Sequence, residues 1–254
     1  MRLRLRFHGL VALLGASAVL WPGAASAAEV PCSQHTDTRL QAMTDAGIGL
    51  TSSLGLTSGR YALPAAAAPY QLVVMFPGHG NDSCAWRSHL QQVAARGAIA
   101  VAMDYTRQTP VENYGWFVRE GAAFSIAAAK HFMAAYPSIT RVIALGVSMG
   151  GNSSGLAVAS SEAVRADGAP LFDYWVDIEG VNNLIEEYLI ARAIAPVNEG
   201  AALAQQEIEE ENGGPLEAMP DRYAEITNIA RAQDMRGLTG AVIVHGLDDG
   251  LVPT

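Results

Sequence analysis

The hydrophobic positions of this chain fall into short continuous runs that alternate with longer segments of helical spacing. A continuous apolar run bounded by Gly or Pro is typical of a strand buried on both faces, as in a parallel sheet. The sequence predicts such strands at residues 71–76, 98–105, 139–147, 172–178 and 239–245. Helices are predicted between them at residues 83–96, 112–136 and 149–164. This alternation predicts a doubly wound, mostly parallel α/β sheet.

The segments outside this alternation carry weaker patterns. Residues 34–43 have the spacing of a short helix, and residues 51–63, rich in Gly, Ser and Thr, favour edge strands. Residues 180–236 interrupt the alternation with apolar positions at helical spacing, and we interpret them as a small helical cap over the sheet edge. The acidic run inside this cap is predicted to be a solvated helix face. Its members are Glu207, Glu209, Glu210 and Glu211.

The first 27 residues have the pattern of a secretory signal peptide. Three arginines precede an apolar run at residues 10–21, and the small-residue cleavage site Ala25-Ser26-Ala27 follows it. The apolar run is too short to span a bilayer as an ordinary helix. We therefore expect a secreted, extracellular protein without a stable membrane anchor. Its mature chain, residues 28–254, is expected to form a single α/β domain.

Composition and charge narrow the classes of partner. Half of the 254 residues are hydrophobic, which is enough for a substantial core, and the formal net charge is −9. Loss of the three leader arginines takes that charge to −12. So acidic a chain is expected to repel nucleic acid and anionic membrane. The sequence carries no signal for an oligomeric state.

Two cysteines remain in the predicted mature chain, Cys32 and Cys84. Secretion permits a disulfide between them, which we favour over two free thiols or pairing with other cysteines. The cysteines and the scattered histidines show no spacing typical of metal ligands, so no metal site is predicted.

The strand predicted at residues 139–147 leads into the pentapeptide Gly146-Val-Ser-Met-Gly150. A G-x-S-x-G segment between a buried strand and a helix is the context of a nucleophile elbow, whose tight turn lifts the serine oxygen above the sheet. The two glycines relieve crowding in that turn. The helix N-terminus behind Ser148 offers backbone N–H groups to a developing negative charge. The alternative is an ordinary serine in a glycine-rich turn, and the flanking strand and helix favour the nucleophile.

Three motifs in this order resemble the α/β-hydrolase superfamily. Pro77-Gly-His-Gly-Asn81 resembles its oxyanion loop, Gly146–Gly150 its nucleophile elbow, and His245-Gly-Leu-Asp-Asp-Gly-Leu-Val-Pro253 the segment that carries its triad acid. The last segment most resembles the prolyl-oligopeptidase and dienelactone-hydrolase branches. The resemblance implies a serine hydrolase that cleaves small ester or peptide-like substrates through an acyl-serine intermediate. It implies no cofactor.

The resemblance also assigns roles to individual residues. Ser148 falls on the nucleophile, and the backbone N–H groups of Met149 and Asn81 fall on the oxyanion hole. Asp249 falls on the acid, with Asp248 as the neighbouring alternative. Each oxyanion donor in such a site stabilises the tetrahedral intermediate by about 3 kcal/mol.

The catalytic histidine is the part of the family pattern that this sequence does not supply. In this family the histidine follows the acid, but no histidine follows Asp249 here. His79 is expected to brace the oxyanion loop, and His245 is expected to be structural. Two explanations compete: a chain that continues beyond Thr254, or a degenerate, non-catalytic binding protein with the same fold. We favour the continuation, because the acid segment has little use without its histidine.

Two carboxylates, Asp177 and Glu179, lie at the end of the strand predicted at residues 172–178. Ligands of open α/β sheets bind at the carboxyl ends of the strands. One hypothesis is that Glu179 forms an acidic subsite that favours a cationic or hydroxyl-rich substrate. The alternative is hydrogen bonding at the hinge of the cap.

Overall fold

The computed structural model describes residues 40–42, 50–52, 55–57, 59–104, 115–235, 237–247, 249 and 252. These residues belong to one compact unit, Thr36–Thr254. The predicted signal peptide and Cys32 lie outside the described residues. Secretion and the pairing of Cys32 with Cys84 therefore stay predictions.

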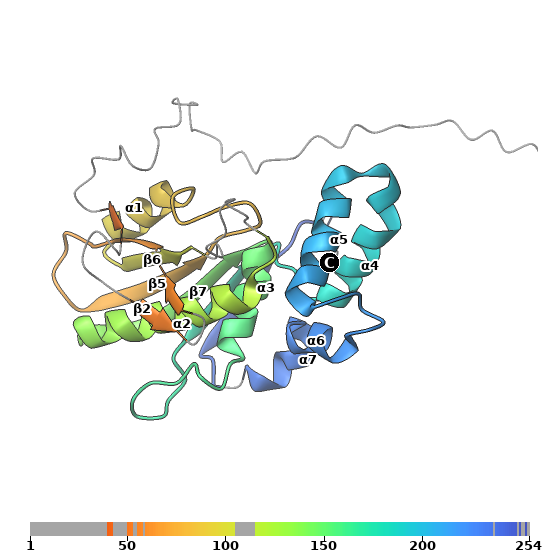
Figure 1. Ribbon diagram of the computed structural model, residues 1–254. Helices are drawn as coiled ribbons and strands as arrows, with labels where there is room; N and C mark the ends of the chain where they lie inside the picture. Colours follow the sequence, from red (N-terminus) through yellow and green to blue (C-terminus); the bar gives the residue numbers. More distant parts are fainter. Residues whose placement is uncertain are drawn as a thin grey trace, which may run out of the picture. The chain divides into compact units, whose positions relative to one another are not determined.

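One sheet organises the described part of the chain, with seven strands there in the order β1-β4-β6-β5-β7-β8-β9 (Figure 1). Strands β6, β5, β7, β8 and β9 run parallel to one another, and β4 is antiparallel to both of its neighbours. This arrangement confirms the predicted α/β fold class. The strands are β1 (Leu40–Ala42), β4 (Gly59–Ala62), β5 (Tyr70–Phe76), β6 (Ile99–Met103), β7 (Ile139–Val147), β8 (Tyr174–Ile178) and β9 (Gly240–Val244). A separate hairpin pairs β2 (Leu50–Ser52) with β3 (Gly55–Thr57).

Helices cover both faces of this sheet, so the hydrophobic core has two parts, one on each face. Helix α1 (Arg87–Ala95) packs its Leu90 and Ala94 against one face of β5 and β6. Helices α2 (Val118–Ala135) and α3 (Met149–Val158) cover the other face, where the larger core lies. Because successive side chains of a strand point to opposite faces, the central strands are buried on both sides, as their continuous apolar runs predict.

A group of helices follows β8 and precedes β9, where the cap was predicted (Figure 1). Helices α4 and α5 pack against each other, α6 contacts α4 and α7, and α7 contacts α3. The group comprises α4 (Leu184–Ile194), a 3-10 turn (Ala195–Val197), α5 (Glu199–Asn212), α6 (Pro220–Glu225), α7 (Asn228–Arg231) and a second 3-10 turn (Ala232–Asp234). Asn183 and Asn198 cap α4 and α5 by accepting backbone N–H hydrogen bonds.

Two predictions about local structure are wrong. Residues 40–42, predicted as part of a short helix, form β1 and pair with β4, so sheet pairing overrides the local spacing. The acidic run of α5 is not a solvated face, because Glu207 and Glu211 are buried. Glu207 pairs with His79 and Glu211 pairs with Arg119, and both partners are remote in sequence.

Three helices are shorter than predicted. Helix α1 begins at Arg87 because the preceding residues form a turn, in which the Asp82 side chain accepts the N–H of Ala85. Helix α2 begins at Val118, and α3 ends at Val158. Apolar spacing alone did not locate these ends.

Candidate active site

The turn between β7 and α3 holds Ser148 in an unusual backbone conformation, with φ 56° and ψ −126°. Positive φ is uncommon for a residue other than Gly, and such strain clusters at functional sites. The turn is anchored on both sides: the N–H of Ser148 donates to Ile178 O (3.0 Å), and its carbonyl accepts from the N–H of Gly151 (2.8 Å). The strand, tight turn and helix expected of a nucleophile elbow are therefore present.

The two glycines of the pentapeptide are required by close packing. A Cβ at Gly146 would overlap the carbonyl oxygen of Gly150, and a Cβ at Gly150 would overlap the carbonyl oxygen of Phe76. Any larger residue at either position would displace the turn that carries Ser148.

The loop after β5, residues 77–81, packs against this elbow. A Cβ built on Gly78 would lie 3.4 Å from the Cβ of Ser148 and 3.2 Å from the carbonyl oxygen of Val147. The N–H of Asn81, assigned above to the oxyanion hole, donates instead to Gly78 O (3.1 Å). The Asn81 side chain donates to His79 O (3.0 Å), so this residue closes the turn of the loop.

Asp249 lies on the loop after β9, at the same sheet edge as Ser148. Its Oδ1 accepts the N–H of Val252 (3.0 Å), and its own N–H donates to Gly246 O (3.2 Å). His245 Nε2 lies 2.9 Å from Val252 O and 3.6 Å from Asp249 Oδ2. These contacts join His245 and Asp249 to Val252. Asp248 lies outside the described residues.

Glu179 follows β8 and is also held at positive φ, 50°. Its N–H donates to Val244 O (2.7 Å), which ties it to the end of β9. A Cβ on Gly246 would lie 3.5 Å from Glu179 Oε1 and 3.9 Å from Asp249 Cβ. The carboxylate of Glu179 therefore reaches the loop that carries Asp249.

Comparison with solved structures decides the fold family. The chain is similar to the acylaminoacyl peptidase of Pyrococcus horikoshii, with a TM-score of 0.57 and 14% identity over 81% of this chain and 32% of that one. It is similar to an esterase of Pyrobaculum calidifontis, with a TM-score of 0.53 and 17% identity over 85% and 79% of the two chains. It is also similar to prolyl oligopeptidase B of Galerina marginata, with a TM-score of 0.54 and 13% identity over 86% and 30%.

This chain has the α/β-hydrolase fold. It spans about a third of the length of the two peptidases and about four fifths of the esterase. No protein-family model matches the sequence, and no curated protein sequence matches it either.

In this α/β-hydrolase fold, sheet order brings the predicted site residues to one edge. Strands β5, β7, β8 and β9 are neighbours and parallel, so the loops after them meet at their carboxyl ends. Those loops carry Asn81, Ser148, Glu179 and Asp249, and Met149 begins the helix behind Ser148.

A buried polar network behind the elbow was only partly foreseen. The Asp177 side chain is fully buried and accepts from Asn182 Nδ2 (2.6 Å). Gly151 and Gly180 are pressed against that carboxylate, where a Cβ on either would overlap it. Asn228 Nδ2 donates to Gly151 O (3.1 Å) and to Asn182 Oδ1 (3.0 Å). Burial raises the pKa of Asp177. Its hydrogen bond with Asn182 fits the alternative of hydrogen bonding at the hinge of the cap.

Glu187 of α4 was missed altogether. Its side chain is buried, with 8% of the residue exposed, and its Oε2 has no hydrogen-bond partner among the described residues. Burial, followed by the charges of Asp249 and Glu186, raises the pKa of Glu187 to about 7. The cap therefore carries a weakly acidic group whose charge repels that of Asp249. Its position in an apolar helical pattern gave no sign of this.

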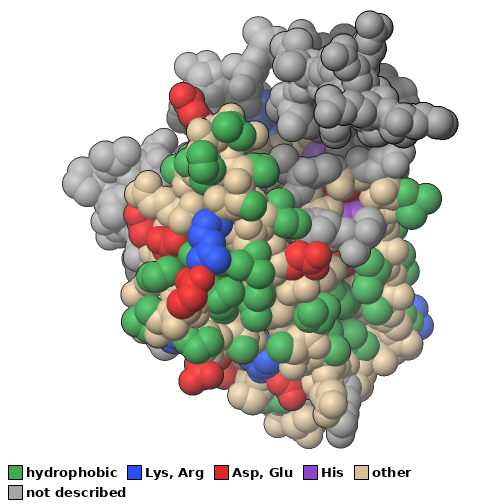
Figure 2. Space-filling view, turned by 90° about the vertical axis from the view of Figure 1, so that its right-hand side faces the viewer, with side chains coloured by type: hydrophobic (Ala, Val, Ile, Leu, Met, Phe, Trp, Pro, Cys, Tyr) green, Lys and Arg blue, Asp and Glu red, His purple; other side chains and the backbone are tan. Residues whose placement is uncertain are grey.

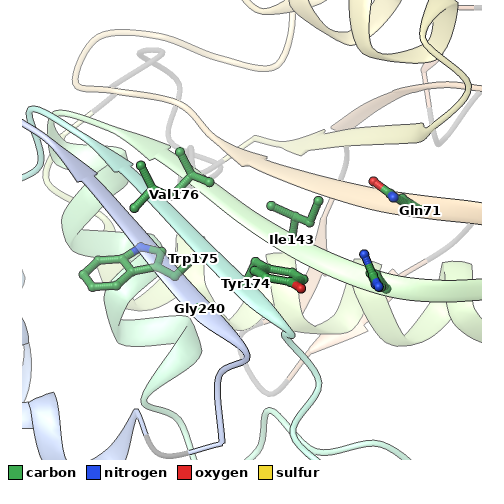
Figure 3. Close-up of a pocket in the computed structure, with 8 residues that line it drawn as sticks. Gln71, Ile143, Tyr174, Trp175, Val176 and Gly240 are labelled. Atoms are coloured by element: carbon green, nitrogen blue, oxygen red, sulfur yellow. The ribbon is translucent and has the colours of Figure 1, made fainter.

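Other features of the described residues set limits on the site. No helix in them is long and apolar enough to cross a membrane. They also contain no group of three or more His, Cys, Asp and Glu side chains placed to hold a metal ion. A hollow of about 280 Å³ lies on the sheet near the amino ends of β8 and β9 (Figure 3). Ser148 is not among the residues that line it. It is lined by Gln71, Arg141, Ile143, Tyr174, Trp175, Val176, Gly240 and Val242.

Proposed function

We propose that this protein is a secreted serine hydrolase that cleaves ester bonds, with amide or peptide bonds as the less favoured substrates. The observation that carries the proposal is the strained Ser148, held at a glycine-bounded elbow. Solved structures of the same fold include an esterase and peptidases, which supports a hydrolase of this general class.

In the proposed reaction, Ser148 Oγ attacks the substrate carbonyl carbon while its proton passes to a base. The leaving group departs with a proton from that base. Water then attacks the acyl carbon while the base takes its proton, and Ser148 Oγ departs with a proton from the base. Met149 begins α3, so its N–H belongs to the helix turn whose donors lack intrahelical partners. We assign the second oxyanion donor to the N–H of His79, because the neighbouring Gly78 packs against Ser148.

The proposed base is a histidine supplied beyond Thr254 and oriented by Asp249. The described histidines have other positions: His79 binds Glu207, His245 binds Val252 O, and His89 and His131 lie in helices. Strand β9 supports a continuing chain, because it carries apolar side chains that are 55% exposed at Val242 and 58% at Ile243. These two residues point to opposite faces, and a further strand and helix would cover them.

We also propose that the acidic groups at this edge favour a substrate with a cationic or hydroxyl-rich group. Glu179 and Asp249 flank Gly246, and Glu187 adds a third carboxyl group nearby. On the face shown in Figure 2, acidic side chains lie scattered among apolar ones, with few basic side chains between them. The net charge, −9 for the whole sequence and −12 without the three leader arginines, would steer a cation in the same sense.

Hydrolysis of a p-nitrophenyl ester by the native secreted protein tests the proposal. Ser148→Ala should abolish the activity. Undiminished hydrolysis by Ser148→Ala would exclude Ser148 as the nucleophile. The second candidate is a non-catalytic binding protein. It is favoured because each described histidine either binds another group or lies in a helix. It predicts no turnover by the native protein or by Ser148→Ala.

A further inference from the structure

We infer that Glu207 of the cap is a positioning residue for the oxyanion loop and that it acts through the side chain of His79. The inference rests on the proposed hydrolase function. Glu207 lies on α5, 128 positions after His79, and its Oε2 is 2.5 Å from His79 Nε2. Only 6% of Glu207 is exposed. A contact between such remote segments joins the cap directly to the loop that packs on Ser148.

The His79 ring also lies near a buried aromatic residue, Trp116. The His79 and Trp116 rings lie 6.0 Å apart between centroids and are inclined by 33°. Trp116 Nε1 donates to Asn152 Oδ1 (3.4 Å), and Asn152 lies one turn after Ser148 in α3. The His79 side chain therefore contacts a carboxylate of the cap and lies near an aromatic ring that is hydrogen-bonded to the elbow helix.

The same elbow helix is joined to the cap a second time. Asn152 Nδ2 donates to the carbonyl oxygen of Ile226, between α6 and α7 (2.6 Å). The cap thus contacts both parts of the proposed site: the oxyanion loop through Glu207, and the helix behind the nucleophile through Ile226.

The contact has a direct consequence for the backbone of the loop. The side chain and the N–H that we assign to the oxyanion hole belong to the same residue, His79. Its neighbour Gly80 has φ +70°, a conformation that favours Gly. The Asn81 side chain also holds this residue, because it donates to His79 O. Fixing the His79 ring therefore limits the movement of the residue that carries this N–H. A preorganised donor of this kind stabilises the transition state without reorganisation during the reaction.

Helix α5 supplies its own control. Glu211, one turn after Glu207, is also buried and also joins the cap to the core. Its carboxylate accepts the N–H of Arg119 (3.1 Å), and the Arg119 guanidinium donates to the Glu211 carbonyl (3.0 Å). This contact ends on α2 and does not touch residues 77–81. Removal of Glu211 should weaken cap attachment without releasing His79.

The experiment compares Glu207→Ala, Glu207→Gln and Glu211→Ala in the full native protein. For each, we would measure kcat and KM on p-nitrophenyl acetate and the thermal midpoint. Glu207→Ala should lower kcat about tenfold or more with little change in KM, as expected for a displaced oxyanion donor. Glu207→Gln should recover most of the rate, since its amide oxygen still accepts a hydrogen bond from His79. Glu211→Ala should lower the thermal midpoint but keep kcat.

Amide hydrogen exchange at residues 78–81 gives a second readout that needs no activity. Glu207→Ala should speed exchange of this loop, and Glu211→Ala should not. Equal losses of kcat in the two alanine variants, or unchanged kcat and exchange in Glu207→Ala, would overturn the inference. A wild-type protein without hydrolysis would instead refute the proposed function, and faster loop exchange in Glu207→Ala would still show the physical link.

Discussion

Gly78 and Ser148 lie so close that a methyl group on Gly78 would be in contact with the Cβ of Ser148, at 3.4 Å. The same methyl group would lie only 3.2 Å from the carbonyl oxygen of Val147. A side chain at position 78 would therefore crowd the loop after β5 against the turn that carries Ser148. This contact brings the proposed oxyanion loop and the elbow together.

Gly78→Ala tests whether that approach matters for catalysis. The added methyl group should push the loop away by a few tenths of an ångström, and we expect kcat for ester hydrolysis to fall about tenfold. Gly240→Ala is the matched control, because a Cβ there meets only Tyr174 at an ordinary 3.5 Å. Full activity in Gly78→Ala would show that the loop does not provide an oxyanion donor.

The sequence predicted the elbow well because its requirements are local. Strand β7 has the predicted bounds, residues 139–147, and Ser148 lies in the turn that the two glycines permit. The buried polar contacts were beyond such reasoning. Glu207 and Glu211 were predicted to belong to a solvated acidic run. They are buried because α5 packs against His79, 128 positions before Glu207, and against Arg119, 92 positions before Glu211. Long-range pairing of this kind leaves no periodic signal in a single sequence.

The turn of the oxyanion loop shows the same limit at short range. The motif placed Asn81 in the expected loop, but the hydrogen bond to Gly78 O turns its N–H inward. A pattern of residue types identifies the loop, whereas the direction of each N–H depends on its backbone angles.

Glu187→Gln should reveal the cost of burying this carboxyl group. Its pKa is raised to about 7 in the folded protein, against 4.5 as the ordinary value. The folded state therefore loses stability as pH rises from 4.5 to 7, and the penalty is complete above pH 7. One pKa unit corresponds to about 1.4 kcal/mol, so the penalty amounts to about 3 kcal/mol.

Denaturant unfolding at pH 4.5 and pH 8 measures this effect. Glu187→Gln should raise the free energy of unfolding by up to about 3 kcal/mol at pH 8 and by little at pH 4.5. Glu210→Gln, on the exposed side of α5, should change neither value by more than about 0.5 kcal/mol. The same gain at both pH values would mean that Glu187 is not a group with a raised pKa.

Glu179→Gln tests the proposed acidic subsite. Paired esters that differ only in a trimethylammonium or a neutral tert-butyl group should be hydrolysed with a preference for the cation by the wild type. Glu179→Gln should reduce that preference about tenfold through kcat/KM, because a carboxylate beside the substrate is lost. Glu210→Gln removes an equal charge at a remote position and should preserve the preference. An equal loss on both esters would assign Glu179 to the cap hinge alone.

Labelling with a fluorophosphonate is the most direct test of the central claim that Ser148 is a catalytic nucleophile. The reagent reacts with activated serines, so the native secreted protein should be labelled, and peptide mass spectrometry should place the adduct on Ser148. Ser148→Ala should remain unlabelled. A native protein that folds and takes no label, or one that carries the label on another serine, would contradict the account.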